Sequence, residues 1–194
     1  MALSIPEQKR ALRKEMIAKR DALSPIFRTQ MAEKIAKTDV PFDVAEGAVV
    51  SGWFAIGNEL NPYPLMKRLA KEYGATLALP AIADGKLIFR AWVPGMQLQR
   101  VGFGLSEPGP EAKEVEPDIL FVPMLAFDLR GYRIGYGKAY YDGGITRLRA
   151  AKKITAAGLA FDAQCVEHVP VEPHDQKLDY VITETGVRFS AGTD

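Results

Sequence analysis

Cysteine and histidine are scarce in this chain of 194 residues, which has one cysteine, Cys165, and two histidines. A single cysteine cannot form an intramolecular disulfide, and no second cysteine is present to build a zinc site. Two histidines are also too few for a multi-histidine metal cluster. The composition therefore excludes a disulfide-stabilised scaffold and a zinc centre of cysteine and histidine.

Long hydrophobic runs are missing as well. No stretch approaches the roughly eighteen apolar residues that a helix needs to cross a bilayer, and the N-terminal sequence MALSIPEQKR lacks the apolar core of a signal peptide. The formal net charge of +1 argues against a general nucleic-acid binder, because binding to a phosphate backbone needs a positive field. We therefore expect a cytoplasmic monomer that binds neither membranes nor nucleic acids.

The rest of the composition is that of a folded protein. Hydrophobic residues make up 47% of the chain and charged residues 25%, and the length fits one domain that spans residues 1–194. Positive charge gathers near the N-terminus, where residues 1–37 carry nine Lys and Arg against four Asp and Glu. Such a segment is either a solvated helix face or the contact surface for a small anionic ligand.

Segments typical of helices and strands alternate along the chain. Helix formers fill Pro6–Leu23, and Ser24 followed by Pro25 predicts a new helix start, since serine accepts bonds from free N–H groups and proline fits the first turn. The other predicted helices cover residues 25–37, 64–73 and 138–151. Short apolar runs bounded by glycine, proline or polar residues predict strands at residues 48–54, 75–79, 86–92, 118–123, 154–161 and 178–183.

This alternation predicts an α/β fold of three layers, in which an open and largely parallel sheet carries helices on both faces, a Rossmann-like architecture. Residues 118–123 are the best candidate for a central strand, and residues 178–183 are expected to form the last one. Residues 94–117 are rich in glycine and proline and are expected to form a long, mostly irregular connection. Long loops in compact domains are often functional.

Three glycines lie in the segment Phe127–Asp142 (FDLRGYRIGYGKAYYD), between a predicted buried strand and a predicted helix. Glycine lets a backbone approach a phosphate closely, and a helix N-terminus offers unpaired N–H groups. Arg130, Arg133 and Lys138 add positive charge there, and loops at the carboxyl ends of such strands often bind ligands. The spacing matches neither a Walker A loop nor the dinucleotide-binding fingerprint, so an ordinary glycine-rich turn is the alternative interpretation.

Two acidic positions are candidates for holding a divalent cation. Asp142 follows a double tyrosine, and magnesium prefers one or two carboxylates together with substrate oxygens and water; an acid favoured by the helix dipole is the simpler explanation. Asp179 is flanked by apolar residues, where an acid is out of place unless it faces a cation or a site. His174, in the polar loop before this strand, is either a general base or a hydrogen-bonding loop residue.

Together these segments resemble the 5-formyltetrahydrofolate cyclo-ligase family, and the resemblance spans essentially the whole chain. The matching segments are, in chain order, Lys9–Arg13 as the family's Lys-x-x-x-Arg helix, Trp53–Leu60, Gly102–Pro108, Val122–Asp142 (VPMLAFDLRGYRIGYGKAYYD), Ala160-Phe161 with Gln164, and the sequence HDQKLDYVIT. The strongest match is Val122–Asp142, and the order and spacing of all these segments follow the family.

The resemblance implies an enzyme that uses ATP and magnesium to convert the small molecule 5-formyltetrahydrofolate into 5,10-methenyltetrahydrofolate, with release of ADP and phosphate. ATP would phosphorylate the formyl oxygen, N10 would attack the activated carbon, and phosphate would leave. This chemistry suits the residues present, since phosphoryl transfer asks a protein chiefly for positioning and charge stabilisation.

The resemblance also implies roles for individual residues. The implied nucleotide contacts are Lys9, Arg13, Arg133, Gly135, Tyr136, Gly137, Lys138 and Tyr141. The implied folate contacts are Phe54, Glu59, Tyr136 and Tyr140. Those expected to act most directly in catalysis are Lys138, Arg133 and Tyr140, and the expected magnesium ligands are Asp142 and Asp179.

Some positions depart from the family pattern. Asn61-Pro62 stand where relatives often have a further acid or threonine, Tyr136 occupies a position that can be arginine, and Ala139 replaces a common glycine. These changes leave the expected magnesium and phosphate contacts in place, but they bear on recognition of the pterin and the glutamate tail. A paralogue with the same ATP site and another small substrate is therefore the alternative.

Overall fold

The computed structural model describes residues 3–102 and 105–191. Its helices are α1 (Ile5–Asp21), α2 (Pro25–Lys37), α3 (Tyr63–Tyr73) and α4 (Tyr140–Ala151), with a short 3-10 helix, η2 (Asp162–Gln164). Its strands are β1 (Val49–Ser51), β2 (Thr76–Ala83), β3 (Lys86–Ala91), β4 (Leu98–Arg100), β5 (Ser106–Pro108), β6 (Ile119–Val122), β7 (Ala126–Phe127), β8 (Arg133–Ile134), β9 (Thr155–Leu159), β10 (Tyr180–Thr183) and β11 (Gly186–Ser190). Phe103 and Gly104, which belong to the Gly102–Pro108 segment, lie outside the described residues.

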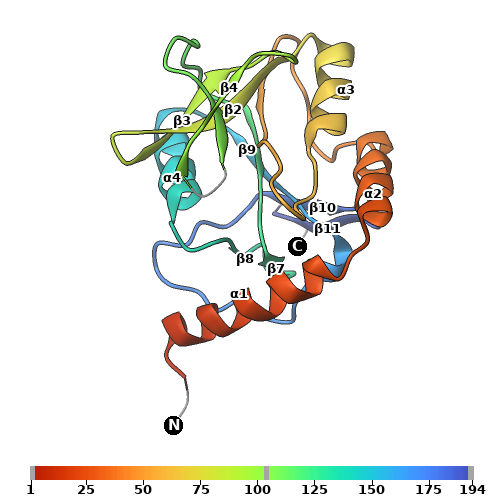
Figure 1. Ribbon diagram of the computed structural model, residues 1–194, viewed down its shortest axis with the longest axis vertical. Coiled ribbons are helices and arrows are strands. Elements are labelled where there is room, and N and C mark those ends of the chain that lie inside the picture. Colours follow the sequence, from red (N-terminus) through yellow and green to blue (C-terminus); the bar gives the residue numbers. More distant parts are fainter. Residues whose placement is uncertain (1–2, 103–104, 192–194) are drawn as a thin grey trace.

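A seven-stranded sheet forms the centre of the molecule (Figure 1), with the strand order β11-β10-β9-β6-β1-β2-β3. The five inner strands are parallel to one another. The two edge strands, β3 and β11, pair antiparallel with their neighbours. The predicted α/β fold with a largely parallel sheet is confirmed.

Helices cover both faces of this sheet. In β6 the side chains alternate, so that Ile119 and Phe121 join the core beneath α2 and α3, whereas Leu120 and Val122 join the core beneath α4. All four side chains are buried, as expected for a central parallel strand with a helix layer on each side. Within the described residues, no helix combines the length and the hydrophobicity needed to span a membrane.

Helix α1 belongs to neither layer and crosses the molecule at the end of the sheet where the β7–β8 hairpin lies (Figure 1). Its Met16 is fully buried and packs in a small cluster with Leu125, Ile134 and Val169. This contact fixes the basic N-terminal helix against the segment that follows β6, which is the segment that carries the predicted phosphate-binding glycines.

Local signals located most helix ends correctly. The hydroxyl of Ser24 accepts a hydrogen bond from the Phe27 N–H at 3.2 Å, which confirms the predicted start of α2, and α3 ends at Gly74 with a left-handed backbone (φ 63°). Helix α4 begins at Tyr140 rather than at residue 138, because Ala139 has a positive φ of 53° and cannot continue a right-handed helix.

Short strands account for the main differences from the sequence-based prediction. The connection over residues 94–117 contains the antiparallel pair β4–β5, and the loop before α4 contains the pair β7–β8. Strand β11 follows the strand that was expected to be the last. These strands have two to five residues, which is too few for a side-chain pattern to distinguish a strand from a turn.

Candidate active site

The basic residues of α1 reach the glycine segment that follows β8. The Arg13 side chain donates a hydrogen bond from Nε to the carbonyl oxygen of Gly135 at 2.8 Å. Gly137 has a φ of +94°, and a Cβ added there would lie 3.1 Å from the guanidinium carbon of Arg13. The structure therefore brings together Arg13, Gly135 and Gly137, three of the predicted nucleotide contacts.

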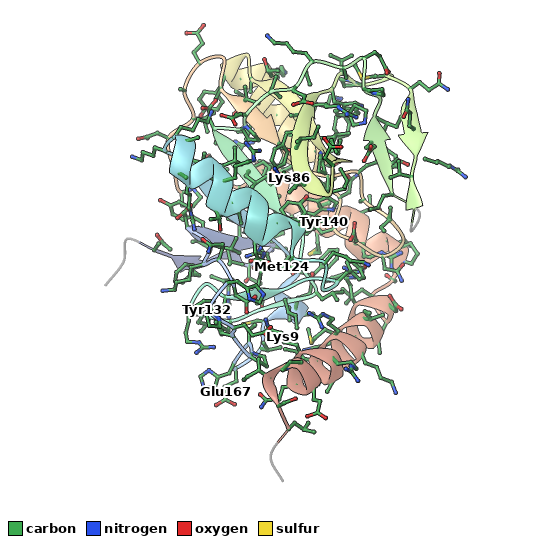
Figure 2. The ribbon with its side chains drawn as sticks, turned by 90° about the vertical axis from the view of Figure 1, so that its left-hand side faces the viewer. Lys9, Lys86, Met124, Tyr132, Tyr140 and Glu167 are labelled. Carbon is green, nitrogen blue, oxygen red and sulfur yellow. The ribbon has the colours of Figure 1, made fainter. Side chains whose placement is uncertain are left out.

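Lys9 is buried rather than exposed to solvent (Figure 2). Its Nζ lies 2.7 Å from Oε2 of Glu172 and 2.5 Å from Oδ2 of Asp175, both in the loop before β10. One lysine between two carboxylates leaves a net negative charge, so this cluster suits a further cation. The sequence did not single out Glu172, and it placed Asp175 only in a polar loop.

Arg133 and Asp142 form a buried ion pair where β8 approaches the start of α4. The Arg133 Nη2 lies 2.9 Å from Oδ1 of Asp142, and Nη1 donates to the carbonyl oxygen of Gln176 at 2.7 Å. Burial lowers the pKa of Arg133 and the Asp142 carboxylate opposes that shift; an arginine remains charged under these conditions. The pair ties the hairpin, the helix and the loop before β10 into one unit.

Asp142 and Asp175 are neighbours in this unit. Oδ1 of Asp142 also accepts a hydrogen bond from the backbone N–H of Gln176 at 2.9 Å, one residue beyond Asp175. Both carboxylates interact electrostatically with the Arg133 guanidinium. Asp142 lies in the first turn of α4, where the helix dipole favours a negative charge. These contacts place Asp175, which the sequence had not assigned to the magnesium site, beside the same arginine as Asp142.

The structure does not bring Asp179 to Asp142, as the predicted magnesium site requires. Asp179 Oδ1 pairs with Arg149 in the last turn of α4 at 2.9 Å, and Oδ2 accepts the N–H of Ala156 at 2.7 Å. Asp142 lies seven residues before Arg149, about 10 Å along a helix, whereas two ligands of one magnesium ion must each lie about 2 Å from it. Asp179 instead caps the amino ends of β9 and β10, which explains an acid among apolar neighbours.

Arg130, which the sequence grouped with the phosphate-binding segment, has a structural partner. Its guanidinium bonds Oδ2 of the fully buried Asp128 at 2.7 Å from Nη2, and the same carboxylate accepts backbone N–H groups of Tyr132 and Val169. This network holds the turn between β7 and β8. Arg130 therefore shapes the hairpin rather than contributing a contact of its own at the glycine segment.

A cavity of about 520 Å³ lies beside α2 and α3, below the loop that follows β1. The predicted folate contacts Phe54 and Glu59 both line it, together with Trp53, Tyr63 and Trp92. Tyr63 and Trp92 pack edge to face with ring centroids 5.6 Å apart. Aromatic walls with a half-buried acid, Glu59, and an exposed one, Glu33, match a flat heteroaromatic ligand that donates hydrogen bonds along one edge.

Glu59 is the half-buried acid of this cavity. Its Oε2 accepts the backbone N–H of Ile56 at 3.1 Å. Burial raises the pKa of Glu59 above its usual range, and the Ile56 N–H, the Arg20 guanidinium and the Trp53 indole oppose the shift. The Trp53 indole N–H has no hydrogen-bond partner among the described residues, so its influence on the pKa of Glu59 is the smallest of the three.

Tyr141 connects the cavity to the charged unit. Burial and the Glu59 carboxylate raise the pKa of its hydroxyl, while the Arg133 guanidinium acts in the opposite direction. The hydroxyl oxygen is buried and has no hydrogen-bond partner among the described residues. Tyr141 thus lies within electrostatic reach of both the predicted folate acid and the predicted phosphate arginine.

The remaining predicted contacts lie on the exposed rim. Figure 2 shows Tyr140 at the N-terminal end of α4, and Tyr136 and Lys138 are exposed in the segment before it. Beside Asp142 an open hollow of about 400 Å³ is lined by Gly143, Arg147 and His174, among others. The His174 Nε2 is 3.8 Å from Oδ1 of Asp175, and its side chain is mostly exposed.

Comparisons with known proteins show the family of the chain. The model of the 5-formyltetrahydrofolate cyclo-ligase family matches residues 5–184. The chain is 29% identical to the 5-formyltetrahydrofolate cyclo-ligase of Escherichia coli K12 over 177 residues (87% of this chain, 96% of the relative) and 28% identical to that of Mycolicibacterium smegmatis over 188 residues (92% and 94%).

A solved structure is similar over nearly its whole length. The NMR structure of Aquifex aeolicus 5,10-methenyltetrahydrofolate synthetase superposes with a TM-score of 0.76 at 31% sequence identity, covering 96% of this chain and 94% of that one. A family match that includes α1, the glycine segment and β10, together with this structural likeness, leaves one assignment: the chain belongs to the 5-formyltetrahydrofolate cyclo-ligase family of enzymes.

Proposed function

We propose that this chain converts 5-formyltetrahydrofolate into 5,10-methenyltetrahydrofolate in a reaction that consumes ATP and needs magnesium. The observation that carries the proposal is that Glu59, which lines an aromatic cavity, and Arg133, in the charged unit beside the glycine segment, both act electrostatically on the buried Tyr141 hydroxyl. A pterin-sized cavity and a phosphate-type site that meet at one side chain suit a reaction in which a phosphoryl group passes to the folate.

The reaction is a phosphoryl transfer followed by ring closure. The formyl oxygen attacks the γ-phosphorus of ATP, the bond from phosphorus to the bridging oxygen breaks, and ADP leaves. The lone pair of N10 then attacks the formyl carbon, N10 loses its proton, and the carbon–oxygen bond to the phosphate breaks. Inorganic phosphate leaves as the methenyl ring closes. Neither step needs a covalent enzyme intermediate, so the side chains act by positioning and charge.

On the nucleotide side, the residues proposed to bind the phosphates are Arg13, Lys138 and the backbone of Gly135 and Gly137. Arg13 already contacts Gly135, so its guanidinium is held in position before ATP arrives. A preorganised charge of this kind stabilises the transferring phosphoryl group without reorganisation during the reaction. Lys9 is proposed to join this set while remaining close to Asp175.

On the folate side, Glu59 is proposed to accept hydrogen bonds from the pterin ring, with Phe54 and Tyr140 against its faces. Only the ionised carboxylate accepts from several donors, and its neighbours Ile56 N–H, Arg20 and Trp53 favour that form. The exposed Tyr136 is proposed to contact both ligands, since it stands in the glycine segment.

Asp142 and Asp175 fit a magnesium ion better than the pair first predicted. Arg133 and Gln176 share Oδ1 of Asp142, while Lys9 and Glu172 N–H share Oδ2 of Asp175. These hydrogen bonds leave Oδ2 of Asp142 and Oδ1 of Asp175 for a metal ion, with the His174 Nε2 3.8 Å from the latter oxygen. Within the described residues no group of three or more such ligands exists, and magnesium needs only one or two carboxylates when phosphates supply the rest. Bound there, magnesium would neutralise charge on the transferring phosphoryl group.

Magnesium dependence separates the two aspartates. Asp175→Asn is expected to raise the magnesium concentration for half-maximal activity about tenfold or more, because one carboxylate ligand loses its charge. Asp179→Asn is expected to lower the melting temperature without changing that concentration, because its partners are Arg149 and Ala156. Magnesium titrations at saturating ATP give this concentration for both variants. The reverse pattern would favour Asp142 and Asp179 as the magnesium ligands.

The proposed function is tested with purified protein, 5-formyltetrahydrofolate and ATP. We expect the absorbance band of the methenyl product to appear only when ATP and magnesium are both present, with one ADP and one phosphate released per product. A flat trace from protein that still binds ATP would instead assign the chain to a different small substrate of the same site.

A further inference from the structure

Arg20 is a buried cation that the expected site does not include. It is the penultimate residue of α1, and only 4% of its surface is exposed. Its Nη2 donates a hydrogen bond to the hydroxyl oxygen of Tyr136 at 2.5 Å, and its guanidinium carbon lies 5.8 Å from the centre of the same ring. The Arg20 side chain therefore holds Tyr136 of the glycine segment against the C-terminal end of α1.

Arg20 also lies close to the folate half. Its charge acts on the half-buried Glu59 carboxylate. The next residue of α1, Asp21, accepts a hydrogen bond from the Asn58 side chain at 2.8 Å, one residue before Glu59. The C-terminal end of α1 is thus tied to the loop that carries Glu59 and to the glycine segment that carries Tyr136.

Three buried polar atoms around Glu59 have no hydrogen-bond partner among the described residues: Arg20 Nε, Trp53 Nε1 and the Tyr141 hydroxyl. Buried polar groups are normally paired, and a group left unpaired in a native structure needs an explanation. All three side chains interact electrostatically with the Glu59 carboxylate, and Trp53 lines the same cavity as Glu59. Donors gathered around one carboxylate, at the boundary of two ligand sites, are explained by a ligand that completes their hydrogen bonds.

We propose that Arg20 is a positioning residue for the reaction, which holds Tyr136 of the nucleotide segment beside the end of α1 that is tied to the loop of Glu59, at the boundary between the two ligands. The inference rests on the proposed function. The Arg20 guanidinium bonds the Tyr136 hydroxyl through Nη2, and its Nε is a second, unpartnered donor of the same planar group. A lysine has the charge but cannot supply this geometry.

Glu59 gives a pH readout for this role. The titratable or charged groups that act on it are Arg20 from α1 and Tyr141 from α4, alongside the Ile56 N–H and the Trp53 indole of its own loop. Burial raises the pKa of Glu59 and Arg20 lowers it. If the ionised form binds the folate, activity falls as the pH drops through the pKa of Glu59. This fall is the acid limb of the pH–activity profile, and removal of Arg20 moves it to higher pH.

The experiment compares the full-length wild-type protein with Arg20→Met, Arg20→Lys and Tyr136→Phe, and uses Arg10→Met as the matched control on the exposed face of the same helix. We expect Arg20→Met to lower kcat/KM for 5-formyltetrahydrofolate about tenfold or more, and to move its acid limb up by about one pH unit. Arg20→Lys keeps the charge, so its acid limb stays near that of the wild type while its KM values rise. Tyr136→Phe resembles Arg20→Lys, and Arg10→Met resembles the wild type.

Each outcome decides between defined alternatives. The positioning role would be overturned if Arg20→Met had the same acid limb and kcat/KM as Arg10→Met and differed from it only in a lower melting temperature. An equal shift of the limb in Tyr136→Phe would also overturn it, because the hydroxyl alone would then account for the effect. Absence of turnover in the wild-type protein would refute the proposed function itself, and that result is obtained before any variant is measured.

Discussion

Replacing Asp142 with alanine is expected to lower turnover more than about a hundredfold, because it removes a charge placed where the phosphoryl group is transferred. The same change should destabilise the fold. It leaves the buried Arg133 without its counter-ion, and breaking a buried ion pair costs about 3–5 kcal/mol. In a chain of this length each kcal/mol lowers the melting temperature by about 2–4 °C. Turnover and thermal unfolding of the purified variant measure the two effects.

A double variant separates these two roles of Asp142. Arg133→Met combined with Asp142→Leu replaces the buried pair with apolar side chains, and such replacements often recover the stability that a single removal loses. We expect the melting temperature to return toward that of the wild type while turnover stays low. Near-normal turnover in a folded Asp142→Asn variant would remove Asp142 from the reaction and leave it a purely structural partner of Arg133.

The layered fold was predictable because its signals are local. The four consecutive apolar residues Ile119–Val122 indicate a strand buried on both faces. Ser24-Pro25 and Gly74 mark helix ends by their own backbone chemistry. The short pairs were not predictable from the sequence. Two-residue strands such as Ala126–Phe127 exist because Asp128 and Arg130 hold the turn, and that network is a property of the folded chain.

Contacts within one segment of the sequence were predictable, whereas contacts that depend on how distant segments pack were not. The sequence alone correctly indicated that Asp179 needs a partner, but the partner is Arg149. Gln176 bonds Asp142 in the first turn of α4, whereas Asp179, three residues later, bonds Arg149 in the last turn of α4 and Ala156 at the start of β9. A spacing of three residues gives no sign of this separation, so the two acids looked equivalent.

Long-range pairs explain the other omissions. Lys9 meets Glu172 and Asp175 across more than 160 positions of sequence, and Arg20 meets Tyr136 across 116. A positive helix face at the N-terminus was recognised as a contact surface or a solvated face. Which of its cations are buried, and against which carboxylates, depends on where α1 docks, and that is set by Met16 in a cluster contributed by three other segments.

Gly137→Ala is expected to reduce kcat/KM for ATP about a hundredfold, since a shift of about 1 Å in a positioning group can cost that much. Two causes contribute. The φ of +94° is strained for any residue with a Cβ, and that Cβ would press on the Arg13 guanidinium from 3.1 Å. Gly47→Ala is the matched control, because its φ is +71° and no atom lies within 4 Å of the added Cβ. It should lose about 1–2 kcal/mol of stability and retain its activity.

Arg13 decides which of the two causes reduces activity. If the added methyl acts by displacing the guanidinium, Gly137→Ala should cost far less in an Arg13→Ala background than in the wild type, so the two substitutions should not be additive. Kinetics of both single variants and the double variant at varied ATP measure this coupling. Full additivity would mean that the backbone of the glycine segment, rather than crowding of Arg13, accounts for the loss. Equal losses of activity in Gly47→Ala and Gly137→Ala would mean that both result from general backbone strain. The close approach at Gly137 would then no longer support an ATP site.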